Sequence, residues 1–299
     1  MYSTNRLGIR GAEPPSNRDN ILSLLAVGGS TTQCYWLDDQ QAWPYLVQQK
    51  LTRADHRAWV GNAGMSGQSS RGHFFLLNEL LPAIRPRAVL FLVGMNDIKF
   101  LARQPERNQG DSRDLYATSR SSLGNSLFRF LMPAMILFDP ESFRTDRNLP
   151  SKPYHHELPR GLVANDIDSE ILSNALHEYQ ENLRNLSQTV KANSAKPIFM
   201  TQPSLYSASS YWEHHAGPGF FMDHQDRRFS GAAFWKYLDL YNQALLQVCH
   251  TEAIQCLDLE KEIPKSEDYF YDDQHFNIAG SELVSDTITQ FLLNPKQHL

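Results

Sequence analysis

Residues 21–31 read ILSLLAVGGST, and this stretch decides the fold class. Residues 21–27 are apolar apart from Ser23, without the polar–apolar alternation of a half-exposed strand. Such a run predicts a strand that is buried on both faces, as in a parallel sheet covered by helices. The run ends in Gly28, Gly29 and Ser30, where glycine lets the backbone turn sharply and leaves the serine hydroxyl uncovered.

Further apolar runs follow this strand along the chain, with helical patterns between them. Short apolar runs predict further strands, and apolar residues spaced three to four apart predict the helices between them. The alternation indicates an α/β fold with a five-stranded parallel sheet between layers of helices. The predicted strands are 21–27, 58–60, 88–93, 197–201 and 253–257, and the predicted helices are 39–51, 74–84, 169–192, 232–250 and 278–293.

Two segments stand apart from this alternation. Residues 1–20 are polar and rich in Arg, Asn and Pro, so we treat them as an N-terminal extension to a single domain of residues 21–299. Residues 101–165 are rich in Arg, Asp, Pro and Ser around the apolar island 127–138. We expect them to form an insertion or cap over the site, with the island as a core helix in preference to a membrane-contacting lid.

Composition narrows the class of function. The chain is 41% hydrophobic and 20% charged, which is ordinary for a soluble globular protein. Its formal net charge of -5 argues against nucleic-acid partners and against strong attraction to anionic lipid. No run reaches the roughly 18 apolar residues of a membrane span, so we expect no transmembrane segment in this chain.

The N-terminal residues and the cysteines bear on the compartment. Residues 1–20 do not resemble a signal peptide but fit the stub left by a trimmed anchor, so we expect a periplasmic or secreted location over a cytoplasmic one. Cys249 and Cys256 form a disulfide if their Cα atoms come within about 7 Å, or else pack as small apolar side chains. For Cys34 we expect packing.

No spacing of metal ligands is recognisable in the sequence. The doublets at residues 155–156 and 214–215 direct adjacent histidines in different directions, which favours loops over a shared metal. We therefore expect neither a metal nor another cofactor.

Polar residues gather where the predicted strands end. Ser30 follows the first strand, Gly67 lies after the second, Asn96 follows the third, and Asp272 and His275 follow the last. Ligands of open parallel sheets bind outside the carboxyl ends of the strands. Acyl transfer requires a nucleophile, a base oriented by a third group, and donors for the oxyanion, and these residues offer a candidate for each.

Four blocks, in this order, resemble those of the SGNH (GDSL-type) hydrolases. Residues 28–31 (GGST) look like their Gly-Asp-Ser block, and residues 62–67 (NAGMSG) resemble their second block. Residues 94–97 (GMND) match Gly-x-Asn-Asp, and residues 272–275 (DDQH) match Asp-x-x-His. The resemblance covers about residues 20–105 and 195–295.

The resemblance implies a catalytic triad of Ser30, His275 and Asp272. It also implies an oxyanion hole made by the N–H groups of Ser30 and Gly67 and the side chain of Asn96. Together with the alternation of strands and helices, it predicts a three-layer α/β/α sandwich with a five-stranded parallel, flavodoxin-like sheet. One departure is Gly29, which stands where the family has Asp; that Asp is not a triad member.

These inferences predict a serine esterase for short-chain acyl esters, including O-acetyl groups on carbohydrate. Two alternatives stay open: a glycan O-acyltransferase with the same triad, and a non-catalytic carbohydrate-binding or scaffold module. A loop with four aromatic residues is either a sugar-stacking platform or local packing. These residues are Tyr206, Tyr211, Trp212 and Phe220.

Asp272 and Asp273 are adjacent, and only one is expected to orient the histidine. A residue three positions back along a turn lies on the same side as His275, while one two positions back points away. We therefore predict Asp272 as the triad acid, and Asp273 as a solvated residue or a cap of the following helix.

Overall fold

The computed structural model describes residues 2–16, 20–102, 163–164, 167, 169–207, 228–229 and 231–297, all within one compact unit. Its main sheet has five parallel strands in the order β2-β1-β3-β5-β7. The predicted α/β sandwich with a five-stranded parallel sheet is confirmed. The strands are β1 (Leu22–Gly28), β2 (Ala58–Gly64), β3 (Ala88–Leu92), β5 (Lys196–Met200) and β7 (Gln255–Leu257).

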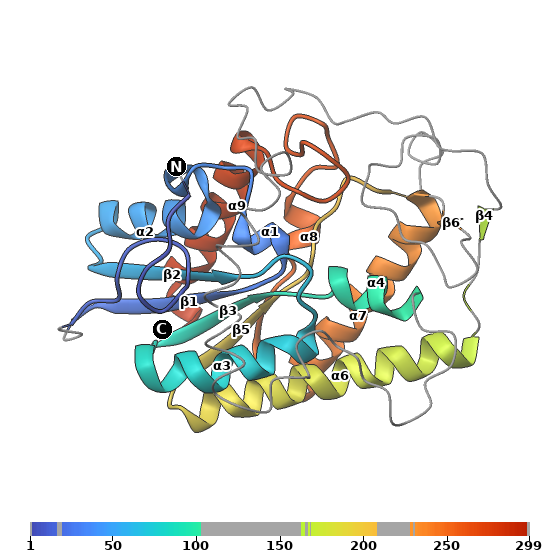
Figure 1. Cartoon of the computed structure of the whole chain (residues 1–299), viewed down its shortest axis with the longest axis horizontal. Helices are drawn as coiled ribbons and strands as arrows, with labels where there is room; N and C mark the ends of the chain where they lie inside the picture. Colours follow the sequence, from blue (N-terminus) through green and yellow to red (C-terminus); the bar gives the residue numbers. More distant parts are fainter. Residues whose placement is uncertain are drawn as a thin grey trace. The chain divides into compact units, whose positions relative to one another are not determined.

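Helices cover both faces of this sheet (Figure 1). On one face α2 (Trp43–Arg53) packs against α9 (Ile278–Leu293). On the other face α6 (Ser169–Ala192) lies between α3 (Ser70–Ile84) and α7 (Gly231–Thr251). Every residue of β3 is buried, as expected of a central strand with apolar side chains on both faces.

Short elements follow the carboxyl ends of the strands. In Figure 1 the strands β1 and β3 run from left to right, and α1 and α4 come directly after them. Polar residues after these strands therefore collect at one edge of the sheet. Three short elements follow strands of the sheet: α1 (Ser30–Gln33), α4 (Met95–Ala102) and α8 (Leu259–Glu262). The others are η1 (Asp39–Gln41) after α1, η3 (Pro295–Gln297) after α9, and a separate parallel pair, β4 (Val163–Ala164) and β6 (Arg228–Phe229).

Three predicted elements have a boundary that differs by about four residues from the structure, and one of them is the helix predicted at 74–84, which begins at Ser70. The predicted strand 58–60 continues to Gly64, because its glycine-rich part pairs with β1 as far as Gly28. Glycine is a weak strand former, and the local sequence therefore favoured a loop there. The predicted helix 39–51 is divided into η1 and α2, because Ala42 between them has extended backbone (φ -71°, ψ 134°).

The N-terminal segment lies along the sheet. The Arg10 N–H donates to the Asn62 carbonyl (2.8 Å), and the Asn62 N–H donates back to Arg10 (3.4 Å), so the segment pairs with β2 in antiparallel fashion. The predicted insertion, including the island 127–138, lies outside the described residues except for the end of α4 and for β4.

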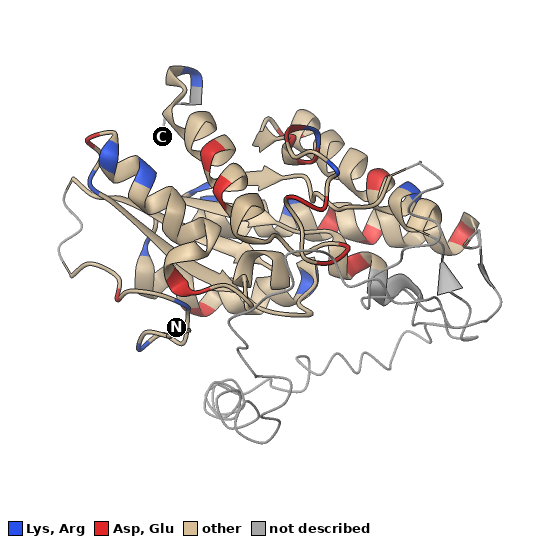
Figure 2. Cartoon of the chain, turned by 90° about the horizontal axis from the view of Figure 1, so that it is seen from above, with Lys and Arg blue, Asp and Glu red and all other residues tan. Residues whose placement is uncertain are grey.

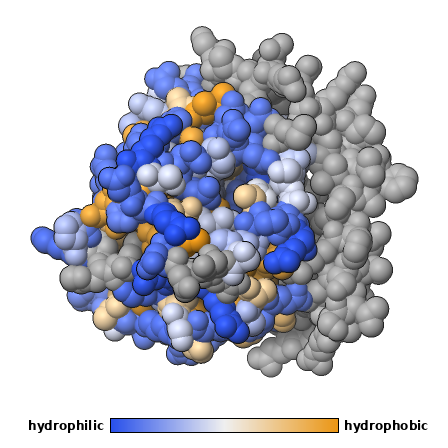
Figure 3. Space-filling model, turned by 90° about the vertical axis from the view of Figure 1, so that its left-hand side faces the viewer, coloured by the Kyte–Doolittle hydropathy of each residue, from blue (hydrophilic) through white to orange (hydrophobic). Residues whose placement is uncertain are grey.

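The described surface carries mixed charge. Figure 2 shows Lys and Arg interspersed with Asp and Glu over the helices and loops. The face at the amino ends of the strands is largely hydrophilic, with hydrophobic residues scattered among polar ones (Figure 3). In the described part of the chain, no helix is both long and apolar enough to cross a membrane.

A disulfide joins helix α7 to the last strand of the sheet, β7. Cys249 near the end of α7 bonds to Cys256 in β7, seven positions further along the sequence, with Cα atoms 6.2 Å apart. Of the two alternatives left open by the sequence, the structure therefore has the covalent pair. Cys34 is a free, buried thiol.

Opening this disulfide should lower stability. Closing a loop this short is worth about 2–3 kcal/mol in the chain-entropy account, so reduction should lower Tm by about 3–5 °C. Denatured but unreduced protein should expose one reactive thiol, that of Cys34. The Cys249→Ser/Cys256→Ser variant is the control, because reductant should leave its Tm unchanged. Three thiols before reduction would contradict the bond.

Candidate active site

Ser30 is the first residue of α1, directly after β1 and Gly29. The N–H groups of Thr32 and Gln33 both donate to the Gly29 carbonyl (3.1 and 3.0 Å), which closes the single turn of helix. The Ser30 N–H belongs to the first turn, where backbone donors have no partner within the helix. The hydroxyl oxygen of Ser30 lies 2.7 Å from Nε2 of His275.

His275 and Asp272 lie in the segment between α8 and α9. Nδ1 of His275 is 2.6 Å from Oδ2 of Asp272. The other carboxylate oxygen accepts from the N–H groups of Gln274 (2.9 Å) and His275 (2.7 Å), so the local turn fixes the carboxylate beside the ring. The Tyr271 ring stacks on the imidazole, with centroids 5.5 Å apart and planes 9° from parallel.

The Asp272 carboxyl is adapted to carry a negative charge. Burial alone would raise its pKa, but the charge of His275 and hydrogen bonds from the imidazole and from the Gln274 and His275 N–H groups lower it overall. An ionised carboxylate beside Nδ1 holds the tautomer whose Nε2 accepts a proton, and stabilises the imidazolium that forms. The structure thus brings the three predicted triad residues into one hydrogen-bonded chain.

Asn96 lies in the first turn of α4, against the nucleophile segment. Its Nδ2 donates to the Gln68 carbonyl (2.9 Å), which uses one of the two amide hydrogens. A Cβ built on Gly29 would lie 2.5 Å from this same nitrogen. The glycine that departs from the family pattern therefore leaves the space that the Asn96 amide fills next to Ser30.

Gly67 lies in a tight turn after β2. The Gln68 N–H donates to the Met65 carbonyl (3.1 Å), and Gly67 has φ +75°, as the third position of a type II turn requires. The turn is tied to the nucleophile segment by two bonds: Met65 N–H to the Gly28 carbonyl (2.9 Å) and Ser66 N–H to the Gln33 side chain (2.9 Å). Gly67 therefore lies beside α1.

Asp97 links α4, which carries Asn96, to the start of α3, which follows the turn at Gly67. Its buried carboxylate accepts from the Ser70 N–H (3.1 and 3.2 Å) and from the Ser70 hydroxyl, at the first residue of α3. Burial raises the pKa of Asp97 to about 6. This bond holds the turn before α3 against α4, which carries Asn96. The sequence indicated Asp97 only as part of a block and gave no sign of its partner.

The prediction for Asp273 is wrong. Its side chain is 3% exposed and accepts from the Tyr206 hydroxyl (2.9 Å), while Asn277 caps α9 by accepting from the Gly280 N–H. The carboxylate is therefore buried against Tyr206. Tyr206 is buried and packs against Phe234, with ring centroids 5.0 Å apart, so this loop aromatic has a packing role.

Other candidates from the sequence separate into two groups. Burial raises the pKa of the Cys34 thiol to about 11, which disfavours the reactive thiolate and fits the predicted packing role. The remaining loop aromatics and both histidine doublets lie outside the described residues. These are Tyr211, Trp212, Phe220, His155, His156, His214 and His215.

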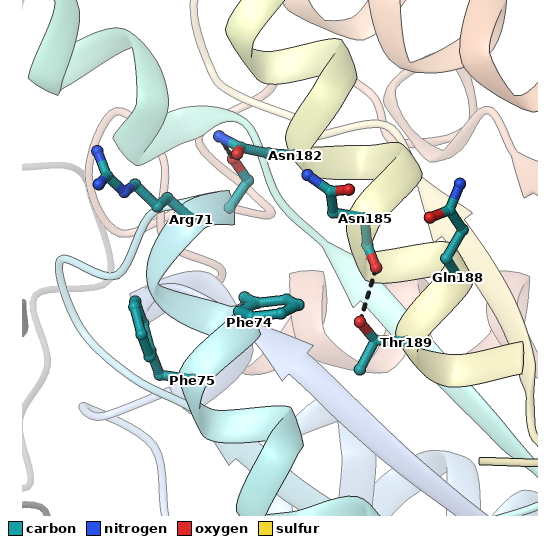
Figure 4. Close-up of a pocket in the computed structure, with 8 residues that line it drawn as sticks. Arg71, Phe74, Phe75, Asn182, Asn185, Gln188 and Thr189 are labelled. Atoms are coloured by element: carbon teal, nitrogen blue, oxygen red, sulfur yellow. Dashed lines mark hydrogen bonds between the residues drawn. The ribbon is translucent and has the colours of Figure 1, made fainter. Parts of the chain in front are cut away.

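A hollow of about 430 Å³ lies between α3 and α6 (Figure 4). The rings of Phe74 and Phe75 line it from α3, and the amides of Asn182, Asn185 and Gln188 line it from α6. It contains none of the predicted triad or oxyanion residues, and we treat it as a feature of the helix layer.

Most of the chain matches a known protein family. Residues 26–283 match the GDSL-like Lipase/Acylhydrolase family. Esterase TesA of Pseudomonas aeruginosa is 36% identical over 75 residues, which are 25% of this chain and 37% of that protein. The chain therefore matches little more than a third of the length of this relative.

Solved structures resemble the whole fold. TesA superimposes with a TM-score of 0.52 at 17% identity, covering 91% of this chain and 98% of that one. Esterase EstA from Pseudoalteromonas sp. superimposes with a TM-score of 0.51 at 18% identity, covering 91% of this chain and 100% of that one. Axe2, an acetylxylan esterase from Geobacillus stearothermophilus, has a TM-score of 0.51 at 16% identity, covering 90% of this chain and 92% of that one.

At these identities the structural neighbours establish the fold alone. The family match spans most of the chain and includes all four blocks recognised in the sequence. The chain therefore belongs to the GDSL-like lipase/acylhydrolase family.

Proposed function

We propose that this protein is a serine esterase that hydrolyses short-chain acyl esters, including O-acetyl groups on carbohydrate. The observation that carries the proposal is the continuous chain of contacts from the Ser30 hydroxyl through His275 to Asp272 (2.7 and 2.6 Å). Family membership supports ester chemistry. The acetylxylan esterases among the structural neighbours suggest the carbohydrate-borne class of substrate.

The proposed reaction has two halves. The Ser30 oxygen attacks the ester carbonyl while Nε2 of His275 takes the hydroxyl proton. The N–H groups of Ser30 and Gly67 and the free hydrogen of the Asn96 amide stabilise the oxyanion. The C–O bond then breaks, and the leaving alcohol receives the proton from His275. Water, deprotonated by the same imidazole, attacks the acyl-serine; the bond to the Ser30 oxygen breaks, this oxygen takes the proton back from His275, and the acid is released.

We also propose that the protein works in an oxidising compartment, periplasmic or extracellular. The support is the Cys249–Cys256 disulfide, since structural disulfides persist there and are rare in a reducing cytoplasm.

The first test is turnover together with covalent labelling. Wild-type protein should hydrolyse acetyl and butyryl esters much faster than esters of twelve carbons or more, and a fluorophosphonate probe should add once. Ser30→Ala should abolish both, because no other described group occupies the position of the nucleophile. Ser173→Ala, on the exposed side of α6, is the matched control. Labelling that survives Ser30→Ala would exclude this serine.

A second test compares the neighbouring aspartates. Asp272→Asn should reduce kcat by up to about 10⁴-fold with little change in Tm, because the amide favours the wrong imidazole tautomer. Asp273→Asn should instead lower Tm, because the Tyr206 hydroxyl would donate to a neutral amide oxygen in place of a carboxylate, and it should leave kcat of the folded enzyme within a few-fold. If Asp273→Asn lost more activity per folded molecule, the triad assignment would be wrong.

A third test uses the contact between Gly29 and Asn96. Gly29→Ala should push the Asn96 amide aside and so remove a donor from the oxyanion hole. The loss of kcat should approach the value typical of a missing oxyanion donor, about 10²–10³-fold. Stability should fall by about 1–3 kcal/mol, as in Asn96→Ala, because the displaced amide also donates to the Gln68 carbonyl in a buried hydrogen bond. Asn96→Ala is the reference, and the double variant should lose no more than Asn96→Ala alone. Fully additive losses would mean that the two residues act separately.

A further inference from the structure

A row of aromatic rings leads from the proposed base toward solvent. Tyr271 stacks on His275, and Trp36 meets Tyr271 edge-on, with centroids 6.5 Å apart and planes at 81°. The Trp36 side chain is 39% exposed, although tryptophan is among the residues with most to gain from burial. The row therefore presents an open aromatic surface within two rings of the imidazole.

The loop that carries Trp36 is held by Arg10 of the N-terminal segment. Arg10, which is 3% exposed, donates from its guanidinium to the carbonyls of Gln33 and Cys34 (2.6 Å each) and of Leu37. These carbonyls lie on both sides of Trp36 in sequence, and that of Cys34 also accepts from the Leu37 N–H (3.0 Å). Since the backbone is held at both ends, the exposure of the indole is imposed by the fold.

A second ring supports the indole from the N-terminal side. Tyr35 lies edge-on to Trp36, with centroids 5.4 Å apart, and Tyr2 lies 5.5 Å from Tyr35. The Arg10 guanidinium lies over the Tyr2 ring at 4.6 Å. Trp36 is thus held between Tyr35 and Tyr271 in edge-to-face contacts, which fix its orientation.

The position of this row indicates which part of a substrate it meets. The acyl carbonyl belongs between Ser30 and Asn96, whereas the leaving alcohol receives its proton from His275. Tyr271 and Trp36 extend from His275, which is the side of the leaving alcohol.

The chemistry of the rings indicates the kind of alcohol. Tryptophan and tyrosine combine an apolar face with a polar N–H or O–H group. A sugar ring has the matching properties, an apolar C–H face edged by hydroxyls. A long aliphatic chain would instead require an enclosed apolar groove, and Trp36 is open to solvent.

We propose that Trp36 and Tyr271 form a stacking subsite for the leaving alcohol, and that this alcohol is a sugar ring bearing the ester. The inference rests on the proposed esterase function and narrows its substrate class. The subsite acts on binding and orientation of the alcohol, and the bond-breaking steps stay with the triad.

The test compares two acetate esters that differ only in the alcohol. One is the monoacetate of methyl β-D-xyloside, and the other is ethyl acetate, whose alcohol is too small to reach Trp36. Trp36→Ala should lower kcat/KM about 3- to 10-fold for the sugar ester, as expected for one lost aromatic contact, and leave ethyl acetate within about twofold. Trp36→Phe should restore part of the loss.

Phe75→Ala is the matched control, since Phe75 is an equally exposed ring (43%) on α3. Equal losses on both esters, or no loss on either, would overturn the subsite. Ethyl acetate turnover by the wild type tests the esterase function separately. Calorimetry with Ser30→Ala tests the subsite without turnover: adding Trp36→Ala should weaken binding of the sugar ester, and unchanged binding would overturn the subsite.

Discussion

The in-register pairing of β1 with both of its neighbours is the constraint on which the site depends. Gly28, the last residue of β1, pairs with Gly64 of β2 on one side and with Leu92 of β3 on the other. The three strands therefore end at the same level, and the segments that follow them leave from one edge. The nucleophile, the tight turn at Gly67 and the amide of Asn96 all lie in those segments.

Hydrogen bonds between the segments then set the distances that chemistry requires. The turn after β2 is held to Gly28 and Gln33, and Asp97 binds the start of α3 to α4. The imidazole is held separately, by a carboxylate that its own turn positions and by a stacked tyrosine. Each proposed catalytic group is thus supported by partners that do not themselves react, which is how a site keeps its geometry without substrate.

The N-terminal segment contributes to this support. Arg10 pairs with the edge strand β2 through its backbone and with the loop after α1 through its side chain. A buried guanidinium is costly unless its donors are satisfied, and here three carbonyls and the Asp39 carboxylate (2.6 Å) satisfy them. A segment that reads as a polar extension is therefore joined to the loop next to the proposed nucleophile.

The sequence by itself determined the fold class, the helices 169–192 and 278–293, and the identity of the triad candidates. These follow from local periodicity and from the order of short blocks, which do not depend on distant contacts. Only the tertiary structure decided that residues 61–64 continue β2, that Asp273 is buried against Tyr206, and that Gly29 makes room for Asn96. Each of these depends on a partner far away in sequence, so the neighbouring residues carry no trace of it.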